Sequence, residues 1–161
     1  MDQRAFEFID LFLTACVSTD AQRDAMVRRV EGLKPLVTPI PPDQIEKLHR
    51  RPGGIGWTVK SPRGTVFVVD QDQPSGCNAR NTGIDVQSIR ILIRKFAEDV
   101  AKDRHLKFEV RQEGYMGPRN PNTFYQEYGL VGEKSLPDYL FAISTSQAGA
   151  QTTYATFAKL K

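Results

Sequence analysis

The stretch IGWTVKSPRGTVFVVD, residues 55–70, decides the fold class of this 161-residue chain. From Trp57 to Lys60 apolar and polar side chains alternate, which is the period-two pattern of a strand with one buried face. Ser-Pro-Arg-Gly at 61–64 is typical of a hairpin turn. The run TVFVVD at 65–70 is apolar enough for a central strand. Residues 55–70 therefore predict an antiparallel hairpin within a sheet.

Further strands are expected on the carboxyl side of this hairpin. Each is a short apolar or alternating run bounded by turn residues, and together they cover 77–80, 106–110, 124–131, 139–144 and 154–159. Because the strands come in runs and do not alternate with helices, the pattern predicts an antiparallel layer. We therefore expect an α+β fold in which N-terminal helices precede an antiparallel sheet of about six or seven strands.

One long helix interrupts the series of strands. Asp85 can cap it, and the helical spacing continues to about residue 102. Its apolar stripe contains Val86, Ile89, Leu92, Ile93, Phe96 and Val100. Much of the opposite face is assigned to the charged residues Arg90, Arg94, Lys95 and Glu98. This amphipathic pattern predicts that the helix packs on the sheet with its charged face in solvent.

Two helices are expected before the sheet. The spacing of apolar residues predicts the first over 4–18, and its inward face holds Ala5, Phe8, Ile9, Phe12, Ala15 and Cys16. The second is predicted to begin at a cap formed by Thr19 or Asp20, because their side-chain oxygens can accept free helix N–H groups. It is predicted to end near Gly32, a residue typical of helix ends.

A proline-rich connector follows these helices. It contains Pro35, Pro39, Pro41 and Pro42, each of which lacks an amide donor and restricts φ, so an extended chain is expected. Pro42 also suits the first turn of a short helix that continues to Leu48. We therefore expect a single α+β domain over 1–161, with a helical part and connector at 1–50 and the sheet with its long helix at 55–161.

Composition excludes several classes of protein. Hydrophobic residues make up 40% of the chain and charged residues 25%, which suffices for a packed core without a metal. The formal charge of +3 is too small to predict a nucleic-acid partner. No stretch of about 20 mostly apolar residues predicts a membrane span. The start, Met-Asp-Gln-Arg at 1–4, lacks the positive region of a signal peptide, so in an exported protein that peptide would have been removed.

No motif predicts a catalytic residue, a metal site or a cofactor. His49 and His105 are expected at helix ends in solvent, and neither belongs to a HExxH pair. No GxSxG motif places a serine on a nucleophile elbow. Gly-Gly-Ile-Gly at 53–56 precedes a strand instead of following one, so it does not fit a dinucleotide-binding turn. We therefore expect a protein that is not an enzyme and holds no cofactor.

Two segments are candidates for contact with a partner or an anion. Residues 47–63 contain five cations and no acid, and Arg51 and Arg63 could grip a carboxylate or phosphate, although a solvated basic rim has the same composition. The loop at 114–122 contains Tyr115, Arg119 and Asn120, which suit a binding loop on a rigid scaffold. A loop of this kind can equally serve only to connect two strands.

The chain has two cysteines, and both fall on apolar positions of predicted elements. Cys16 lies on the inward face of the first helix, and Cys77 begins a strand. A bond between them would close a loop of about 60 residues and stabilise the fold by about 2–4 kcal/mol. Free cysteine is also among the most buried residue types. The residues alone leave open whether the two form a disulfide or remain buried thiols.

Short motifs along the chain resemble those of a known protein family. They are residues 12–16, Arg51-Pro52-Gly53, Trp57 and Val59, Val66-Phe67-Val68, Gly76-Cys77-Asn78-Ala79-Arg80, the helix with Phe96, and residues 140–146. On these motifs the chain resembles a group of small, uncharacterised proteobacterial exported proteins, many of them predicted to be lipid-anchored. The likeness covers most of the chain, and none of the motifs is catalytic.

The resemblance implies a periplasmic or membrane-facing location, with a cysteine at each of the two matching places. Because oxidising compartments favour disulfides, it favours a bond between Cys16 and Cys77. Leu-Thr-Ala-Cys at 13–16 also fits the pattern before a lipid-modified cysteine, whereas Glu7 and Asp10 interrupt the apolar segment such a signal needs. Lipid anchoring is therefore undecided, and the family implies no activity.

The leading hypothesis is an exported, periplasmic or outer-envelope binding module that engages another protein. An inhibitor or immunity factor against an envelope-targeting enzyme is one specific form of it. A first alternative is a hydrolase that acts on an anionic cell-envelope substrate with His49 or His105 as its base. A second alternative is a receptor for a small anionic ligand near Arg51.

Overall fold

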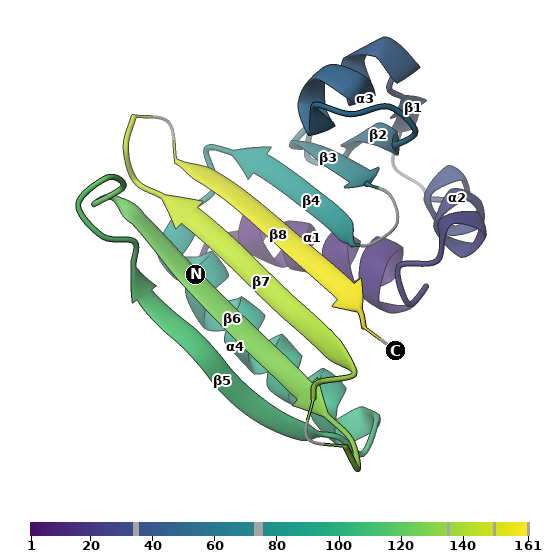
Figure 1. Ribbon diagram of the computed structural model, residues 1–161. Helices are drawn as coiled ribbons and strands as arrows, with labels where there is room; N and C mark the ends of the chain where they lie inside the picture. Colours follow the sequence, from purple (N-terminus) through teal and green to yellow (C-terminus); the bar gives the residue numbers. More distant parts are fainter. Residues whose placement is uncertain (34–35, 73–75, 135, 150, 161) are drawn as a thin grey trace.

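Eight strands form one antiparallel sheet within the part of the chain that this computed structural model describes, residues 1–33, 36–72, 76–134, 136–149 and 151–160 (Figure 1). The strands are β1 (Leu36–Pro39), β2 (Ile55–Lys60), β3 (Val66–Gln71), β4 (Cys77–Thr82), β5 (Lys107–Tyr115), β6 (Thr123–Val131), β7 (Tyr139–Ser146) and β8 (Thr152–Lys159). Their order across the sheet is β1-β2-β3-β4-β8-β7-β6-β5. The predicted α+β class and antiparallel sheet are confirmed.

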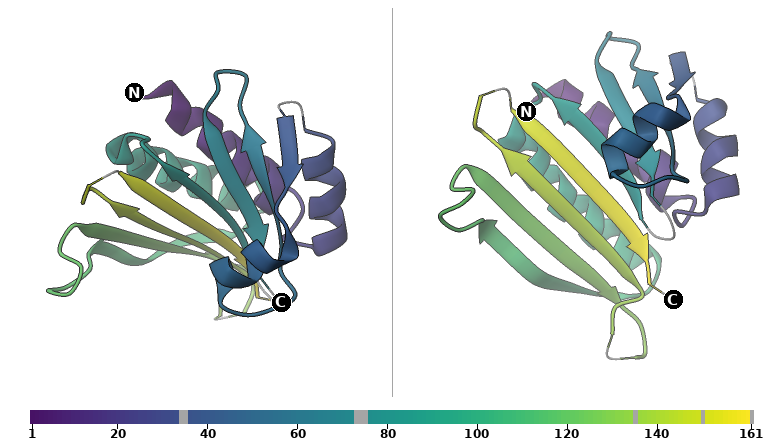
Figure 2. Two further views of the ribbon diagram at one scale, coloured as in Figure 1. Left: turned by 90° about the horizontal axis from the view of Figure 1, so that it is seen from above. Right: turned by 45° about the horizontal axis from the view of Figure 1, so that its top comes forward.

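The helices are α1 (Gln3–Phe12), the π-helical turn η1 (Leu13–Val17), α2 (Arg23–Glu31), α3 (Pro42–His49) and α4 (Val86–Asp103). Figure 2 shows α1 and α4 together on one face of the sheet and α3 on the other. None of these helices, over the described residues, is long and apolar enough to cross a membrane. The faces of the sheet are thus covered unequally, because α3 lies over only one part of the second face.

The connector contains a strand that the sequence pattern did not predict. Leu36 pairs with Lys60 and Pro39 with Trp57, so β1 adds an eighth strand at one edge of the sheet. A proline is tolerated there because an edge strand needs hydrogen-bond donors on one side only. The prolines predict the extended backbone correctly. The pairing with β2 depends on residues outside the connector, so the connector sequence alone does not predict a strand.

The core lies between the sheet and the pair α1 and α4. The six residues predicted on the inward face of the first helix are all fully buried. Phe8 packs against Phe67 of β3 with ring centroids 6.0 Å apart, and Phe12 meets Phe141 of β7 edge to face at 6.1 Å. The first helix therefore spans strands from both halves of the sheet and belongs to the main core.

The predicted cap of the second helix is wrong. The helix α2 starts at Arg23, and Gln22 occupies the N-cap position without a side-chain hydrogen bond. Asp20 and Ala21 adopt positive φ, and the Thr19 hydroxyl donates to the Ala15 carbonyl 2.7 Å away. Thr19 and Asp20 thus form part of the turn between η1 and α2, where the chain reverses before the new helix begins.

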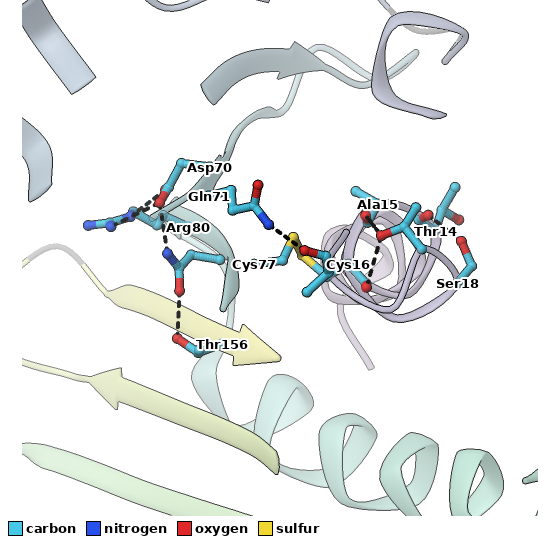
Figure 3. The surroundings of a disulfide bond; sticks show 12 residues. Thr14, Ala15, Cys16, Ser18, Asp70, Gln71, Cys77, Arg80 and Thr156 are labelled. Atoms are coloured by element: carbon cyan, nitrogen blue, oxygen red, sulfur yellow. Dashed lines mark hydrogen bonds and ion pairs between the residues drawn. A yellow bond between two sulfur atoms is a disulfide. The ribbon is translucent and has the colours of Figure 1, made fainter. Parts of the chain in front are cut away.

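A disulfide joins Cys16 in η1 to Cys77 at the start of β4 (Figure 3). Both cysteines are fully buried. The side chain of Gln71 lies beside the bridge and donates to the carbonyl of Ala21. Of the two possibilities that the residues left open, the disulfide is confirmed, and it fastens the N-terminal helices to the centre of the sheet.

Reduction of this disulfide should lower the free energy of unfolding by about 2–4 kcal/mol, because the bond closes a loop with a sequence separation of 61. Urea unfolding of the oxidised and reduced protein would measure the difference. The double variant Cys16→Ala/Cys77→Ala is the control, since reductant should not change its stability. Equal midpoints for the oxidised and reduced wild-type protein would contradict the prediction.

The N-cap of α4 should make stability depend on acid pH. The Asp85 carboxylate accepts hydrogen bonds from the Ser88 hydroxyl at 2.6 Å and the Ser88 amide at 2.9 Å. These bonds hold the pKa of Asp85 below its usual range. The contribution of the Asp85 carboxylate to the stability of the fold is therefore complete above the unfolded-state pKa of about 3.9. It is lost as the pH falls through the lower folded-state pKa.

Replacement Asp85→Ala should cost about 1 kcal/mol of unfolding free energy at pH 7, the usual value of an N-cap. The difference from wild type should shrink as the pH falls below about 4. Urea unfolding at several pH values would measure it, with Asp99→Ala on the exposed side of the same helix as control. A difference that stays constant down to pH 2 would rule out the carboxylate as its source.

Candidate binding site

A buried arginine on α4 marks the strongest candidate site. Arg90 is only 8% exposed, although the helical pattern placed it on the solvent face with Arg94. Its Nε donates to the hydroxyl of Thr145 on β7 at 2.8 Å. Its Nη2 is buried and has no hydrogen-bond partner among the residues the structure describes. Because a buried, unsatisfied donor of a charged group is costly, this nitrogen is a candidate for contact with a ligand or partner.

Two aromatic rings flank the Arg90 guanidinium, and no carboxylate among the described residues forms an ion pair with it. Its Cζ lies 4.4 Å from the ring centroid of Phe124 and 5.6 Å from that of Tyr115. The two rings meet edge to face with centroids 5.1 Å apart. Attraction between a cation and an aromatic face replaces part of the hydration lost on burial, without neutralising the charge. Tyr115 is 59% exposed, so it forms the outer wall of this arrangement.

A pocket of about 510 Å³ lies between α4 and the strands β5 and β6, and Arg90 is part of its lining. Ile91 and Lys95 line it from α4, and Tyr115 and Phe124 line it from the sheet. Sites for small molecules or single side chains commonly have volumes of 300–1,000 Å³. The pocket therefore has the size and the mixed polar and apolar walls of a binding site.

The two acids of the pocket are already paired. Glu113 accepts hydrogen bonds from the Tyr128 hydroxyl at 2.8 Å and from Arg94 at 3.3 Å. Arg94 also donates to Glu98 at 3.2 Å, and these two acids hold the pKa of Arg94 above its usual value. Burial, and then the bond to Glu113, raise the pKa of Tyr128, so its phenol remains a donor. With Arg90, Arg94 and Lys95 against Glu98 and Glu113, the lining carries one more positive than negative charge, and no ion pair joins Arg90 to an acid among the described residues.

The structure brings together three of the residues that the sequence proposed as contacts. Tyr115 ends β5 beside the pocket, and Arg119 and Asn120 follow in the exposed β5–β6 loop. The backbone N–H of Asn120 donates to the Gly117 carbonyl at 2.9 Å, which closes a turn in this loop. The site therefore consists of an exposed segment at 115–120 and the pocket behind it.

Arg51 and Arg63 lie elsewhere. Arg51 precedes β2 and pairs with Asp72, while Arg63 lies in the β2–β3 turn, 3.2 Å from Glu7. They sit at opposite ends of the β2–β3 hairpin, so they do not form a common rim. The strand order also puts this hairpin towards the opposite side of the sheet from β5. Each arginine is engaged by an acid that the local sequence pattern did not reveal.

The expectation that His49 is solvated is wrong. Its side chain is 2% exposed, and its Nε2 lies 2.6 Å from the Asp70 carboxylate. Its Nδ1 lies 3.8 Å from Asp72, and a Cβ on Gly54 would come within 2.5 Å of it. The acid partners are more than 20 residues away in the sequence, so a local helical pattern could not show that the ring turns inward.

A fully buried acid organises the surroundings of this histidine. Asp70 accepts from Asn78 at 2.8 Å and from Arg80 at 2.9 Å, in addition to its contact with His49. Thr156 on β8 donates to Asn78 in turn, at 2.8 Å. Figure 3 shows Asp70 and Arg80 on the side of β3 and β4 away from the disulfide. This cluster links α3 to three strands and explains how that short helix is held on the sheet.

The other histidine lies at a chain reversal. His105 follows α4 with a positive φ of 54° and is exposed. In the described ranges of the chain, no three His, Cys, Asp or Glu side chains gather in a way that could hold a metal ion. Comparison with protein-family models, with curated proteins and with solved structures found no match.

The sequence pattern did not predict the burial of Arg90, because helical spacing groups it with Arg94, one turn further along the charged face. One signal was available: Arg90 lies one helical turn after Val86 and before Ile93, so it borders the apolar stripe. An arginine at such a position can bury its stem or its whole side chain, depending on what the sheet offers. Only the partner strands show which of these happens.

The two buried charges should respond differently to mutation. Arg90→Met should leave the free energy of unfolding unchanged or raise it by up to about 2 kcal/mol, because it removes an unpaired buried charge at similar volume. Asp70→Ala should lower the free energy of unfolding by about 3–5 kcal/mol, because the partners of this buried acid would lose their hydrogen-bond acceptor. Urea unfolding would measure both. A loss above about 2 kcal/mol for Arg90→Met would show that Arg90 is structural.

Proposed function

We propose that this protein is an exported binding module without enzymatic activity, which engages another protein through the 115–120 segment and the Arg90 pocket. The observation that carries the proposal is Arg90, a buried cation with a guanidinium nitrogen that has no partner within the described chain. Stability does not account for such a group, because an apolar side chain would fill the place at lower cost. Binding of a partner would account for it.

The surface around the pocket has the composition of an interface. Ile91 and Tyr115 are each 59% exposed, and Met116 beside them is 40% exposed. Arg119 and Asn120 are exposed polar residues in the loop that follows Tyr115. Aromatic residues, methionine and arginine are enriched in protein interfaces, with polar residues around the edge. The combination favours a protein partner.

The free edges of the sheet are less suited to a partner. At one edge β5 carries a bulge between Val110 and Gln112, together with charged side chains from Lys107 to Glu113. At the other edge β1 has only four residues and ends at Pro39. Bulges, charges, prolines and short strands are the features that protect edges against added strands. Recognition through side chains at the pocket is therefore the better proposal.

The disulfide supports the exported location in this proposal, because such bonds persist in oxidising compartments such as the periplasm. With its sulfur in the bridge, Cys16 has no thiol to carry a thioether-linked lipid. A periplasmic or outer-envelope inhibitor or immunity factor is the specific form we favour. Such a protein needs a rigid scaffold and a preorganised contact surface, which lower the entropy cost of association.

A hydrolase is the competing proposal, and the contact between His49 and Asp70 is the observation in its favour. A general base must come within hydrogen-bond distance of the proton that it removes. The His49 ring is 2% exposed and both of its nitrogens face carboxylates, so a substrate would need α3 to move away. The binding proposal requires no such movement, and we prefer it for that reason.

Site-specific photo-crosslinking would test the binding proposal. A benzophenone amino acid at Met116 should give a discrete cross-linked product in the cell envelope, whereas the same group at Val66, which is 49% exposed on β3, should not. Tyr115→Ser in the Met116-labelled chain should reduce the yield by about fivefold, as expected for loss of an aromatic contact. Equal yields from Met116 and Val66, or no dependence on Tyr115, would refute the proposed surface.

A further inference from the structure

We propose that the Arg90 pocket binds a carboxylate, carried by an aspartate or glutamate of the protein partner next to an apolar side chain. This inference rests on the proposed function, and it adds the chemistry by which the partner is recognised. It goes beyond an anion contact at Arg51, because the structure pairs Arg51 with Asp72.

The charge balance of the pocket favours an anion with one charge. Arg94 already pairs with Glu98 and Glu113, and no ion pair to Arg90 or Lys95 occurs in the part of the chain that is described. One carboxylate would offset the charge of Arg90. A phosphate with two charges would bring more negative charge close to two acids, and repulsion between like charges would weaken its binding.

The remaining donors of Arg90 suit a carboxylate. Its Nε is used by Thr145, whereas Nη2 has no partner in the described residues. The planar guanidinium is the donor that best matches a carboxylate, and hydrogen bonds between ions are stronger than neutral ones. Tyr115 lies over this group and is largely exposed, so rotation of its ring would bring an entering carboxylate within reach.

The apolar walls add a second requirement on the partner. Phe124 and Tyr115 form one side of the pocket, and Ile91 on α4 is exposed beside it. An acidic residue alone would leave these surfaces in water. An aromatic or aliphatic side chain next to the acid would cover them, and about 25 cal/mol is gained for each Å² of apolar surface buried.

Two small probe molecules of the same shape separate the contribution of charge to binding in the pocket from that of shape. The carboxylate 3-phenylpropionate has an acid next to an apolar ring, and 3-phenylpropionamide has the same shape without the charge. NMR titration should show saturable shifts of the Arg90 Nε–H and Tyr115 ring signals with the carboxylate. The amide should bind at least about tenfold more weakly, because it loses a charge-assisted hydrogen bond.

Three variants show whether the response belongs to this pocket. Arg90→Met should abolish the shifts of Tyr115, and Tyr115→Ser should weaken binding of the carboxylate. Arg28→Met, at an exposed arginine on α2, is the matched control and should leave the titration unchanged. An unfolding curve of Arg90→Met like that of wild type would show that loss of binding is not loss of folding.

The outcomes distinguish the inference from the proposed function. Equal binding of acid and amide, no binding of either, or tighter binding of phenyl phosphate at Arg90 would overturn the carboxylate inference, even if the Met116 cross-link forms. Selective binding of the carboxylate supports the inference. If no cross-link forms at Met116 in that case, the pocket takes a free carboxylate and the protein partner is refuted.

Discussion

The pairing of β4 with β8 is the interaction on which the rest of the structure depends. It joins the hairpin strands β2 to β4 to the C-terminal strands β5 to β8, over six residue pairs from Cys77 with Phe157 to Thr82 with Thr152. The long helix α4 carries the chain across the sheet between them. With this pairing in place, α1 can bury its apolar face against both halves at once, and Cys77 lies where the disulfide with Cys16 can form.

The same arrangement creates two buried clusters of charge with different partners. Around Asp70, the side chains of His49, Asn78 and Arg80 supply partners for the carboxylate and hold α3, although His49 Nδ1 has no hydrogen-bond partner among the described residues. Around Arg90 the partners are aromatic rings and one hydroxyl, and a donor is left over. The Asp70 carboxylate has partners within the fold, whereas the Arg90 guanidinium lies beside a pocket and keeps a donor that no described residue uses, which is why we propose a ligand for Arg90.

Local patterns predicted the elements well and their environments poorly. The period of two in β2 and β3 and the apolar stripe of α4 follow from residues close together in the sequence, and the structure confirms them. The burial of Arg90 and of His49 was predicted wrongly, because each depends on residues from distant strands. The strand β1 was missed for the same reason, since only its pairing with β2 distinguishes it from an extended linker.

The sequence by itself determined the α+β class, seven of the eight strands found in the described chain, and the long helix. Spacing and turn chemistry act over a few residues, so they can be read from the chain directly. The tertiary structure alone decided the position of β8 beside β4, the enclosure of His49, and the burial of Arg90 in the lining of a pocket. These features depend on which distant segments come into contact. The energy of a buried charge depends on the charges and hydrogen-bonding groups that the fold places around it.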